Sequence, residues 1–183
     1  MFTGIVKNIG KVEYIRGNKI CIKSDLKNVE LGDSVLVDGV CLTVAEKRKN
    51  RLIMDISLET LKTTALKNMK PGKKVNLETS LTLSDKIGGH FVYGHVMDVG
   101  KIISMKKVRN TELVTIKAGK KFIEKIFPKS SVAVNGVSLT VNEVGRDWFK
   151  LALIPETLNR TNLGNMNLSQ DVNLEADMLV MKK

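Results

Sequence analysis

Short runs of apolar and β-branched residues, separated by glycine, asparagine and lysine clusters, follow one another along this chain. In the first half such runs occupy 4–15, 18–24, 33–47 and 51–57, a pattern typical of short β-strands. Asp-Gly at 38–39, repeated later as Asn-Gly, marks a tight turn, because glycine adopts positive φ without penalty. The pattern therefore predicts short strands joined by tight turns.

Three segments carry a helical pattern instead. Residues 58–68 and 155–165 are predicted to form short helices, and Pro155 suits a first turn because its missing N–H costs nothing there. Residues 120–127 have the spacing of a short amphipathic helix. Its apolar face would consist of Phe122, Ile123, Ile126 and Phe127.

The chain contains an internal duplication. Residues 34–78 align with 131–175 without a gap, and roughly 20 of about 45 paired positions are identical. DGVCLTV in the first half returns as NGVSLTV in the second, and TGIVKNIGKV returns as YGHVMDVGKI. We therefore predict two homologous domains, at 1–86 and 87–183, joined by a polar, glycine-containing linker. About six short strands in each half favour a small closed antiparallel barrel, because closure removes exposed edges.

Composition and charge narrow the class of protein. Hydrophobic residues make up 43% and charged residues 27%, the balance of a soluble globular chain, and no apolar run approaches the roughly 20 residues of a membrane span. The net charge of +11 invites a nucleic-acid interpretation, but the lysines are scattered and aromatics are only 4%. A solvated basic surface is favoured. With no signal peptide and no disulfide or metal spacing of cysteines, we expect a cytoplasmic protein.

The two histidines lie close together, in GGHFVYGHV. His90 and His95 would face opposite ways in an extended chain, which argues against a shared zinc site. They are the candidates for a general base near neutral pH. Gly94, beside His95, would let the backbone approach a ligand closely.

A small polar group recurs at one place in the repeat, as Cys41 and Ser138. A free cysteine is often a small buried hydrophobe, but its replacement by serine favours a ligand-facing role for both. Thr43 and Thr60 recur in the second half, whereas Asp55 is matched by Ala152. Asp177 is likewise matched by a serine. The sequence therefore predicts two related but non-equivalent sites.

These motifs in this order, namely MFTGIV, SVLVDGVCLTV, IGGHFVYGHV, SVAVNGVSLTV, IPETLNRTNLG and VNLEADML, resemble those of the riboflavin synthase family. The resemblance covers nearly the whole chain. It implies an all-β fold of two tandem six-stranded Greek-key barrels with short helices, each barrel binding one pteridine-type ligand. The implied reaction is a dismutation of two molecules of 6,7-dimethyl-8-ribityllumazine. A four-carbon unit passes between them to give riboflavin and 5-amino-6-ribitylamino-uracil, with no cofactor and no metal.

The resemblance also carries site residues onto this chain. It implies an N-terminal pocket and a C-terminal pocket with different linings. The N-terminal pocket would be lined by Gly4, Ile5, Val6, Cys41, Leu42, Thr43, Asp55, Ile56, Ser57, Leu58, Glu59, Thr60, Gly94, His95 and Val96, with Phe2 packed over its ligand. The C-terminal pocket would be lined by Lys129, Ser138, Leu139, Thr140, Ala152, Leu153, Ile154, Pro155, Glu156 and Thr157. For the chemistry we expect proton transfer by His95, orientation by Cys41 and Ser34, and roles for Ser138 and Asp177 in the C-terminal barrel.

Assembly and alternatives complete the expectations. The resemblance implies a homotrimer built on a C-terminal helix, and lumazine synthase as a partner; this chain ends soon after Met178, which puts that helix in doubt. Asn135 stands where many relatives carry aspartate. The main rival function is a non-catalytic carrier of lumazines or flavins, and a nucleic-acid-binding barrel is a distant third. The retained Cys41, Ser138 and His95 favour the enzyme.

Overall fold

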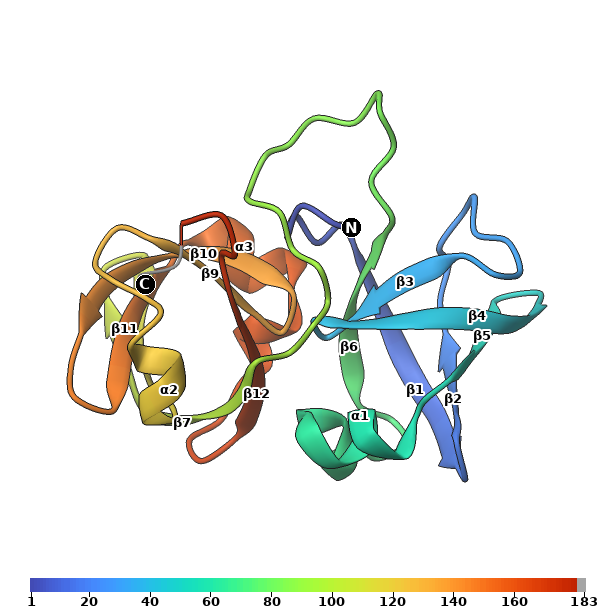
Figure 1. The fold of residues 1–183 in the computed structure, drawn as a ribbon, viewed down its shortest axis with the longest axis horizontal. Coiled ribbons are helices and arrows are strands. Elements are labelled where there is room, and N and C mark those ends of the chain that lie inside the picture. Colours follow the sequence, from blue (N-terminus) through green and yellow to red (C-terminus); the bar gives the residue numbers. More distant parts are fainter. Residues whose placement is uncertain (181–183) are drawn as a thin grey trace.

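The computed structural model describes residues 1–180 and consists of two closed six-stranded barrels lying side by side (Figure 1). The first barrel has the strand order β1-β2-β5-β4-β3-β6 and the second β10-β11-β8-β7-β12-β9, with all neighbours antiparallel. In the first barrel β2 pairs with β5 rather than with β3, which is a Greek-key connection. The predicted all-β, duplicated barrel fold is confirmed.

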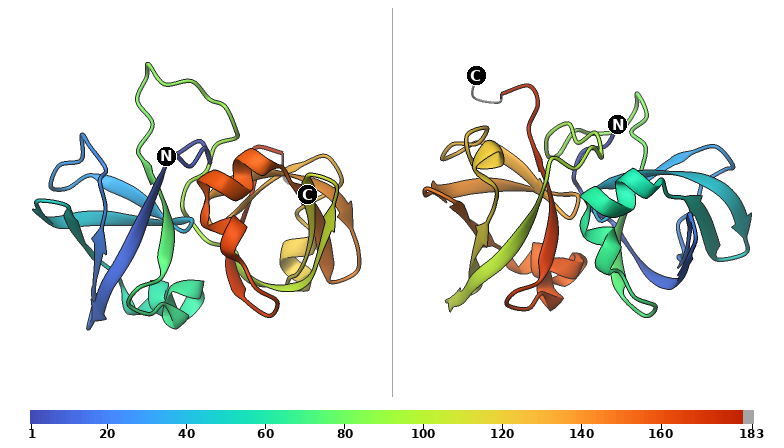
Figure 2. Two further views of the ribbon diagram at one scale, coloured as in Figure 1. Left: turned by 180° about the vertical axis from the view of Figure 1, so that it is seen from behind. Right: turned by 60° about the horizontal axis from the view of Figure 1, so that its bottom comes forward.

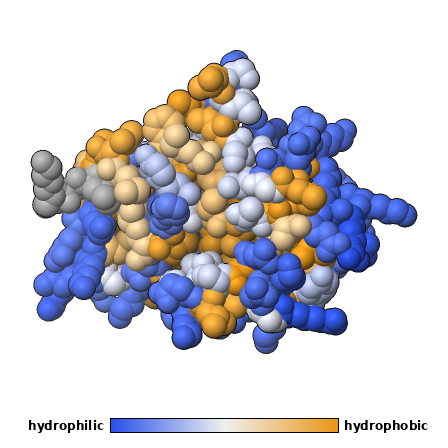
Figure 3. Space-filling view, turned by 45° about the vertical axis from the view of Figure 1, so that its right-hand side comes forward, coloured by the Kyte–Doolittle hydropathy of each residue, from blue (hydrophilic) through white to orange (hydrophobic). Residues whose placement is uncertain are grey.

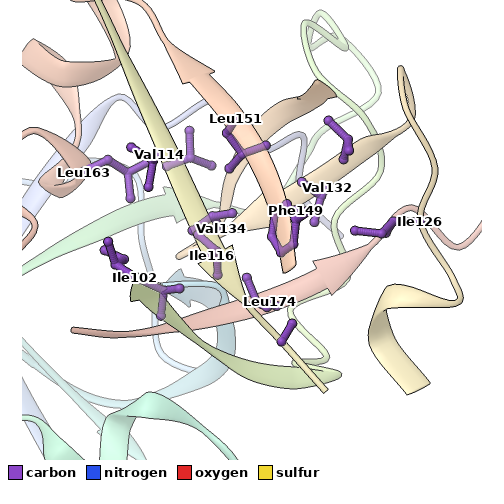
Figure 4. Packing of buried hydrophobic residues seen from close by; sticks show 14 of the residues in the cluster. Ile102, Val114, Ile116, Ile126, Val132, Val134, Phe149, Leu151, Leu163 and Leu174 are labelled. Carbon is purple, nitrogen blue, oxygen red and sulfur yellow. The ribbon is translucent and has the colours of Figure 1, made fainter. Parts of the chain in front are cut away.

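The strands of the first barrel are β1 (Asn8–Arg16), β2 (Lys19–Lys23), β3 (Ser34–Val37), β4 (Val40–Arg48), β5 (Arg51–Asp55) and β6 (Lys74–Thr79). Those of the second are β7 (Asp98–Val108), β8 (Thr111–Lys117), β9 (Ser131–Val134), β10 (Val137–Val144), β11 (Trp148–Leu153) and β12 (Asp171–Ala176). Their alternating side chains fill each barrel with branched residues. Figure 4 shows this packing in the second barrel, where Ile116, Phe149 and Leu174 point into a common interior.

Two short helices, each followed by a 3₁₀ turn, occupy equivalent places in the two halves. α1 (Leu58–Thr63) runs into a 3₁₀ turn, η1 (Ala65–Asn68), and α3 (Pro155–Arg160) runs into η2 (Asn162–Asn165). The Ser57 hydroxyl accepts a hydrogen bond from the N–H of Thr60 and so caps α1. Pro155 occupies the first turn of α3, as predicted.

The predicted amphipathic helix over 120–127 is wrong in its length. Only α2 (Lys120–Ile123) is helical, and Phe127 is 39% exposed rather than buried. The chain leaves the helix in a turn in which the hydroxyl of Ser130 donates to the carbonyl of Phe127, and Lys129 has a φ of 76°. This turn carries Phe127 away from the apolar face formed by the other three residues.

The two repeat phrases meet where the barrels touch. A Cβ built on Gly39 would lie 2.8 Å from the backbone nitrogen of Gly136, so the two turns pack backbone against backbone. The amide nitrogen of the Asn173 side chain donates to the carbonyl of Asp38 at 2.7 Å, and that of Asn76 donates to the carbonyl of Asn135 at 3.0 Å. These reciprocal bonds relate the halves by an approximate two-fold symmetry.

Asp38 breaks this symmetry, because its counterpart is the uncharged Asn135. Its Oδ1 accepts from the N–H of Asn76 at 2.7 Å and from the side-chain amide of Asn162 at 2.8 Å. Burial raises the pKa of Asp38 to about 7, although these hydrogen bonds and the positive charge of Lys73 act in the opposite direction. A carboxyl group that titrates near neutral pH therefore sits in the seam between the barrels.

Residues 80–97 connect the barrels and project from the molecule before returning along it (Figures 1 and 2). The domain boundary that we predicted at 86/87 falls within this connection and stays a prediction. On the face drawn in Figure 3, hydrophilic surface covers both ends of the molecule, and hydrophobic surface extends from the projecting segment towards the middle. Among residues 1–180 no helix has the length and apolarity needed to cross a membrane.

Candidate functional site

The outer faces of β3 and β4 carry the small polar residues of the first half. Leu42 is buried in the barrel interior, so its neighbours Cys41 and Thr43 point outwards. Ser34 pairs with Thr43 across the two strands and therefore shares this outer face. In the second half the pairing of β9 with β10 sets Ser131 opposite Thr140 and Ala133 opposite Ser138. Each barrel thus has one wall that presents hydroxyl or thiol groups.

Two chain segments lie against these walls, and each comes from the opposite half. We call residues 2–6 the first arm and residues 92–96 the second arm. The N–H of Ser138 donates to the carbonyl of Gly4 at 2.9 Å, and the N–H of Cys41 donates to the carbonyl of Gly94 at 3.0 Å. The first arm therefore lies on the C-terminal barrel and the second arm on the N-terminal barrel. The arms also form a bridge with each other, at Phe2 and Val92.

This crossing corrects the pocket to which the first arm was assigned. We expected Gly4, Ile5 and Val6 beside the N-terminal pocket, but Gly4 contacts Ser138, and Val6 is buried among the core residues of the C-terminal barrel. Val96 of the second arm packs against the N-terminal core in the same way. Val6 and Val96 thus anchor their arms on the opposite barrels, because packing against those cores removes the apolar side chains from water.

Glycine is required where each arm turns. Gly4 has a φ of +74° and Gly94 a φ of +78°, conformations that other residues rarely adopt. A Cβ on Gly94 would lie 2.5 Å from the Cβ of Cys41, and a Cβ on Gly4 would lie 2.6 Å from the Cβ of Ser138. We predicted that Gly94 lets the backbone approach a ligand closely. In the structure it approaches Cys41, and the approach to a ligand stays a prediction.

One glutamate holds each arm, and of the two Glu175 is buried and Glu78 is half-buried. The carboxylate of Glu78, on β6, accepts from the N–H and hydroxyl of Thr3, both at 2.8 Å, and from the N–H of Gly4 at 3.0 Å. The carboxylate of Glu175, on β12, accepts from the N–H groups of Tyr93 at 2.6 Å, Gly94 at 2.9 Å and His95 at 3.1 Å. Burial raises the pKa of both glutamates, and the backbone donors lower it by less.

Of the two histidines, His90 is the one whose side chain lies beside a predicted site residue, Ser138. Its Nδ1 lies 2.7 Å from the Oγ of Ser138, and its side chain is buried. Burial lowers the pKa of His90, while the negative charge of Asp177 acts to raise it, so the imidazole is neutral at physiological pH. Its Nε2 has no hydrogen-bond partner among residues 1–180.

His95, our expected proton-transfer residue, lies on the other barrel. Its backbone N–H is held by Glu175, and its exposed ring faces that of Tyr93 at 6.4 Å between centroids. It belongs to the second arm, whose Gly94 contacts Cys41. The structure therefore gives each wall its own histidine: His90 beside Ser138, and His95 on the arm that touches Cys41.

The other expected pocket residues divide into exposed and buried sets. Those with exposed or half-exposed side chains are Ile5, Cys41, Thr43, Asp55, Ser57, Leu58, Glu59, Thr60, Lys129, Ser138, Leu139, Thr140, Ala152, Ile154, Pro155, Glu156, Thr157 and Asp177. Those buried in hydrophobic cores are Phe2, Val6, Leu42, Ile56 and Leu153. Phe2, expected over the N-terminal ligand, instead packs with Leu36, Val92 and Ala133 where the halves meet. Its ring fixes the arms and has no open face.

A separate pocket of about 220 Å³ lies between the first arm, β6 and the connecting segment. Thr3, Ile5 and Glu78 line it together with Lys7 and Lys86. Among residues 1–180 no group of three or more histidine, cysteine, aspartate or glutamate side chains could hold a metal ion.

Sequence reasoning gave no role to Glu78 and Glu175. The signal was present, because VNLE closes both repeats and keeps its glutamate where other charged positions have diverged. The crossing of the arms carried no such signal.

Residues 3–80 and 93–177 match the lumazine binding domain, one copy in each half. The chain therefore belongs to the lumazine-binding domain family. Its curated relatives include the riboflavin synthase of Photobacterium leiognathi, 38% identical, with 98% of this chain and 85% of the relative covered. The riboflavin synthase of Actinobacillus pleuropneumoniae is 36% identical, with 98% and 86% covered.

Solved structures of LumP have the same fold. LumP complexed with riboflavin is 29% identical, with a TM-score of 0.89, and 96% of this chain and 99% of that chain are covered. LumP complexed with 6,7-dimethyl-8-(1'-D-ribityl) lumazine gives a TM-score of 0.85 at 28% identity, with 96% and 99% covered.

Proposed function

We propose that this protein is a riboflavin synthase, which converts two molecules of 6,7-dimethyl-8-ribityllumazine to riboflavin and 5-amino-6-ribitylamino-uracil. The observation that carries the proposal is the pair of matched walls, each completed by an arm from the other half, in a chain that aligns with riboflavin synthases over nearly its full length. Two copies of one substrate need two similar sites. The atoms of the two substrates account for both products, so no oxidant or reductant is required.

Each site would combine a wall with an arm. In the N-terminal barrel Cys41 and Thr43 would face the ligand beside the second arm, with Ser34 on the same face. In the C-terminal barrel the wall of Ser138 and Thr140 adjoins the first arm. Hydroxyl groups and arm backbone can hydrogen-bond the polar edge of a heterocycle, and the half-exposed apolar residues can cover its face.

The chemistry proposed for the C-terminal site is proton removal from the 7-methyl group of the substrate. That proton is acidic because the resulting carbanion delocalises into the ring. A neutral His90 hydrogen-bonded to Ser138 can receive the proton through the hydroxyl group, and Asp177 stabilises the imidazolium that forms. Holding the two substrates in a reactive geometry makes the larger contribution to lowering the activation free energy, on the order of 7–11 kcal/mol in favourable cases.

For the N-terminal site we propose proton transfer by His95, with Cys41 and Ser34 orienting the bound substrate or its nucleophile. What supports these roles is placement: Cys41 and Ser34 share the outer face, and His95 is on the arm bonded to Cys41.

The proposed setting is a cytoplasmic homotrimer that can associate with lumazine synthase. The resemblance to the family supports both assemblies. Exposed Leu58 and Ile154, at the starts of α1 and α3, are apolar groups that a neighbouring subunit could bury beside the two sites. Analytical ultracentrifugation tests the trimer directly, and a monomer that turns over substrate contradicts it.

A binding protein without turnover is the second candidate, and the likeness to ligand-bound LumP favours it. Incubation of the protein with a large excess of 6,7-dimethyl-8-ribityllumazine separates the two. Riboflavin formed in many-fold excess over protein supports the synthase. A spectral shift that saturates with one or two ligands per chain, without riboflavin, supports the binding protein.

A further inference from the structure

Each arm is hydrogen-bonded on two sides, and the residues that bind its two sides belong to different barrels. In the second arm the N–H groups of Tyr93, Gly94 and His95 point to Glu175 on β12, while the carbonyl of Gly94 accepts from the N–H of Cys41 on β4. The arm therefore spans the gap between a glutamate of the C-terminal barrel and the wall of the N-terminal barrel.

The first arm has the same arrangement with the barrels exchanged. Glu78, on β6 of the N-terminal barrel, accepts from the N–H groups of Thr3 and Gly4, while the carbonyl of Gly4 accepts from the N–H of Ser138 on β10. Glu78 and Glu175 occupy equivalent places in the repeat, and Glu175 is buried whereas Glu78 is half-buried.

We propose that each glutamate is the positioning residue of the site on the opposite barrel: Glu175 sets the site at Cys41, and Glu78 sets the site at Ser138. The assignment deepens the proposed function and rests on it, because it is the proposed sites that the glutamates position. Glu175 contacts only the backbone of His95, not its imidazole, and the hydrogen bonds of Glu78 are to Thr3 and Gly4. Each acts by holding the arm whose glycine closes on the wall.

A carboxylate suits this task because both of its oxygens accept hydrogen bonds. Oε1 of Glu175 receives one N–H and Oε2 receives two. Glutamine has nearly the same shape but presents an NH₂ group at one of these places, where it would face an N–H donor. Aspartate keeps both acceptors but is one methylene shorter, so it cannot reach the arm without a shift of the backbone. The two variants therefore weaken the hydrogen bonds between this side chain and the second arm in different ways.

The thiol of Cys41 reports on the second arm without requiring catalysis. Gly94 lies directly against Cys41, whereas the only other cysteine, Cys21, is fully buried. In Glu175→Gln we expect the rate of Cys41 modification by a maleimide, followed by peptide mass spectrometry, to rise about tenfold, the effect of losing one charge-assisted hydrogen bond. Glu78→Gln is the matched control and should leave that rate within about twofold of the unmodified protein.

Equal acceleration in both variants, or acceleration only in Glu78→Gln, overturns the assignment. Cys21 modification is followed in the same digest, because a rise at both cysteines reports global opening and also overturns the specific role. Should Glu175→Gln fail to fold, Glu175→Asp is measured with the same expected direction. Riboflavin production is then assayed: kcat should fall in Glu175→Gln and recover in part in Glu175→Asp. Changed thiol rates with no turnover in the unmodified protein would leave the arm mechanism standing and reject the synthase.

Discussion

At the scale of single residues, the contact of Gly94 with Cys41 explains why a small residue is needed at both places. The arm approaches the wall so closely that a Cβ on Gly94 would lie only 2.5 Å from that of Cys41. Gly4 and Ser138 make the same contact on the other barrel. The change from thiol to hydroxyl therefore preserves a small group under the arm, while it alters the chemistry offered to the ligand.

Gly94→Ala should lower the free energy of unfolding by on the order of 3 kcal/mol, because it combines a positive φ with a clash. Gly17→Ala is the control: it has a φ of +58°, but a Cβ there meets nothing within 4 Å. It should cost about 1 kcal/mol. Urea denaturation measures both, and equal costs would show that the arm does not press on Cys41.

The pairing of His90 with Ser138 leads to a prediction about catalysis. Ser138→Ala and His90→Gln should each reduce kcat by about a hundredfold, and the double variant should be little worse than either, because the two act as one proton path. Steady-state assays of riboflavin formation give these values. Multiplicative losses in the double variant would mean that the two side chains act independently.

The N-terminal wall is tested by its own pair of variants. Cys41→Ser and His95→Gln should each slow turnover well beyond twofold, since the first changes the group under the arm and the second removes the proposed proton carrier. Rates within a factor of about two of the unmodified protein would remove both residues from the chemistry.

At this scale the repeat pointed to the small polar residues that the structure places on the outer walls, because such residues recur at these positions in both halves. Their contact with a ligand stays a prediction. The repeat did not reveal the burial of Phe2 or the partner of His90. Both depend on contacts between residues from different repeats, and neither alternation nor spacing within one repeat reports on such contacts.

At the scale of elements, the turns between β3 and β4 and between β9 and β10 have a second role: they form the seam between the barrels. Asp-Gly and Asn-Gly were read from the sequence as tight turns, and both are. Their mutual packing could not be anticipated, because a turn signal describes only the local chain.

Asp38 makes this seam sensitive to pH. Its native pKa of about 7 lies above the ordinary value of 3.8, so between these values the folded protein holds a proton that the unfolded chain has released. Its contribution to stability is therefore full below about pH 4 and is lost as pH rises through 7.

Asp38→Asn removes this dependence and keeps the acceptor oxygen, as Asn135 already does in the other turn. The stability advantage of the variant should grow between pH 4 and 7, with a slope of at most about 1.4 kcal/mol per pH unit. Asn135→Asp should introduce a second dependence of the same sign. Parallel curves of unfolding free energy against pH for all three proteins would refute the role of Asp38.

At the scale of the whole molecule, the fold followed from the sequence more fully than the site did. Strand periodicity and the gapless repeat predicted two closed antiparallel barrels, because strand number and closure depend on local pattern and on the avoidance of open edges. The exchange of arms between barrels changes how the site is understood. Each site draws on both halves, so neither half is expected to bind its ligand properly alone.

The stoichiometry of turnover tests the central claim most directly. With purified protein and excess 6,7-dimethyl-8-ribityllumazine, chromatography should show one riboflavin and one 5-amino-6-ribitylamino-uracil for every two substrate molecules consumed, over many turnovers and without added cofactor. Substrate that is bound but recovered unchanged, or riboflavin formed without the pyrimidine product, would contradict the account.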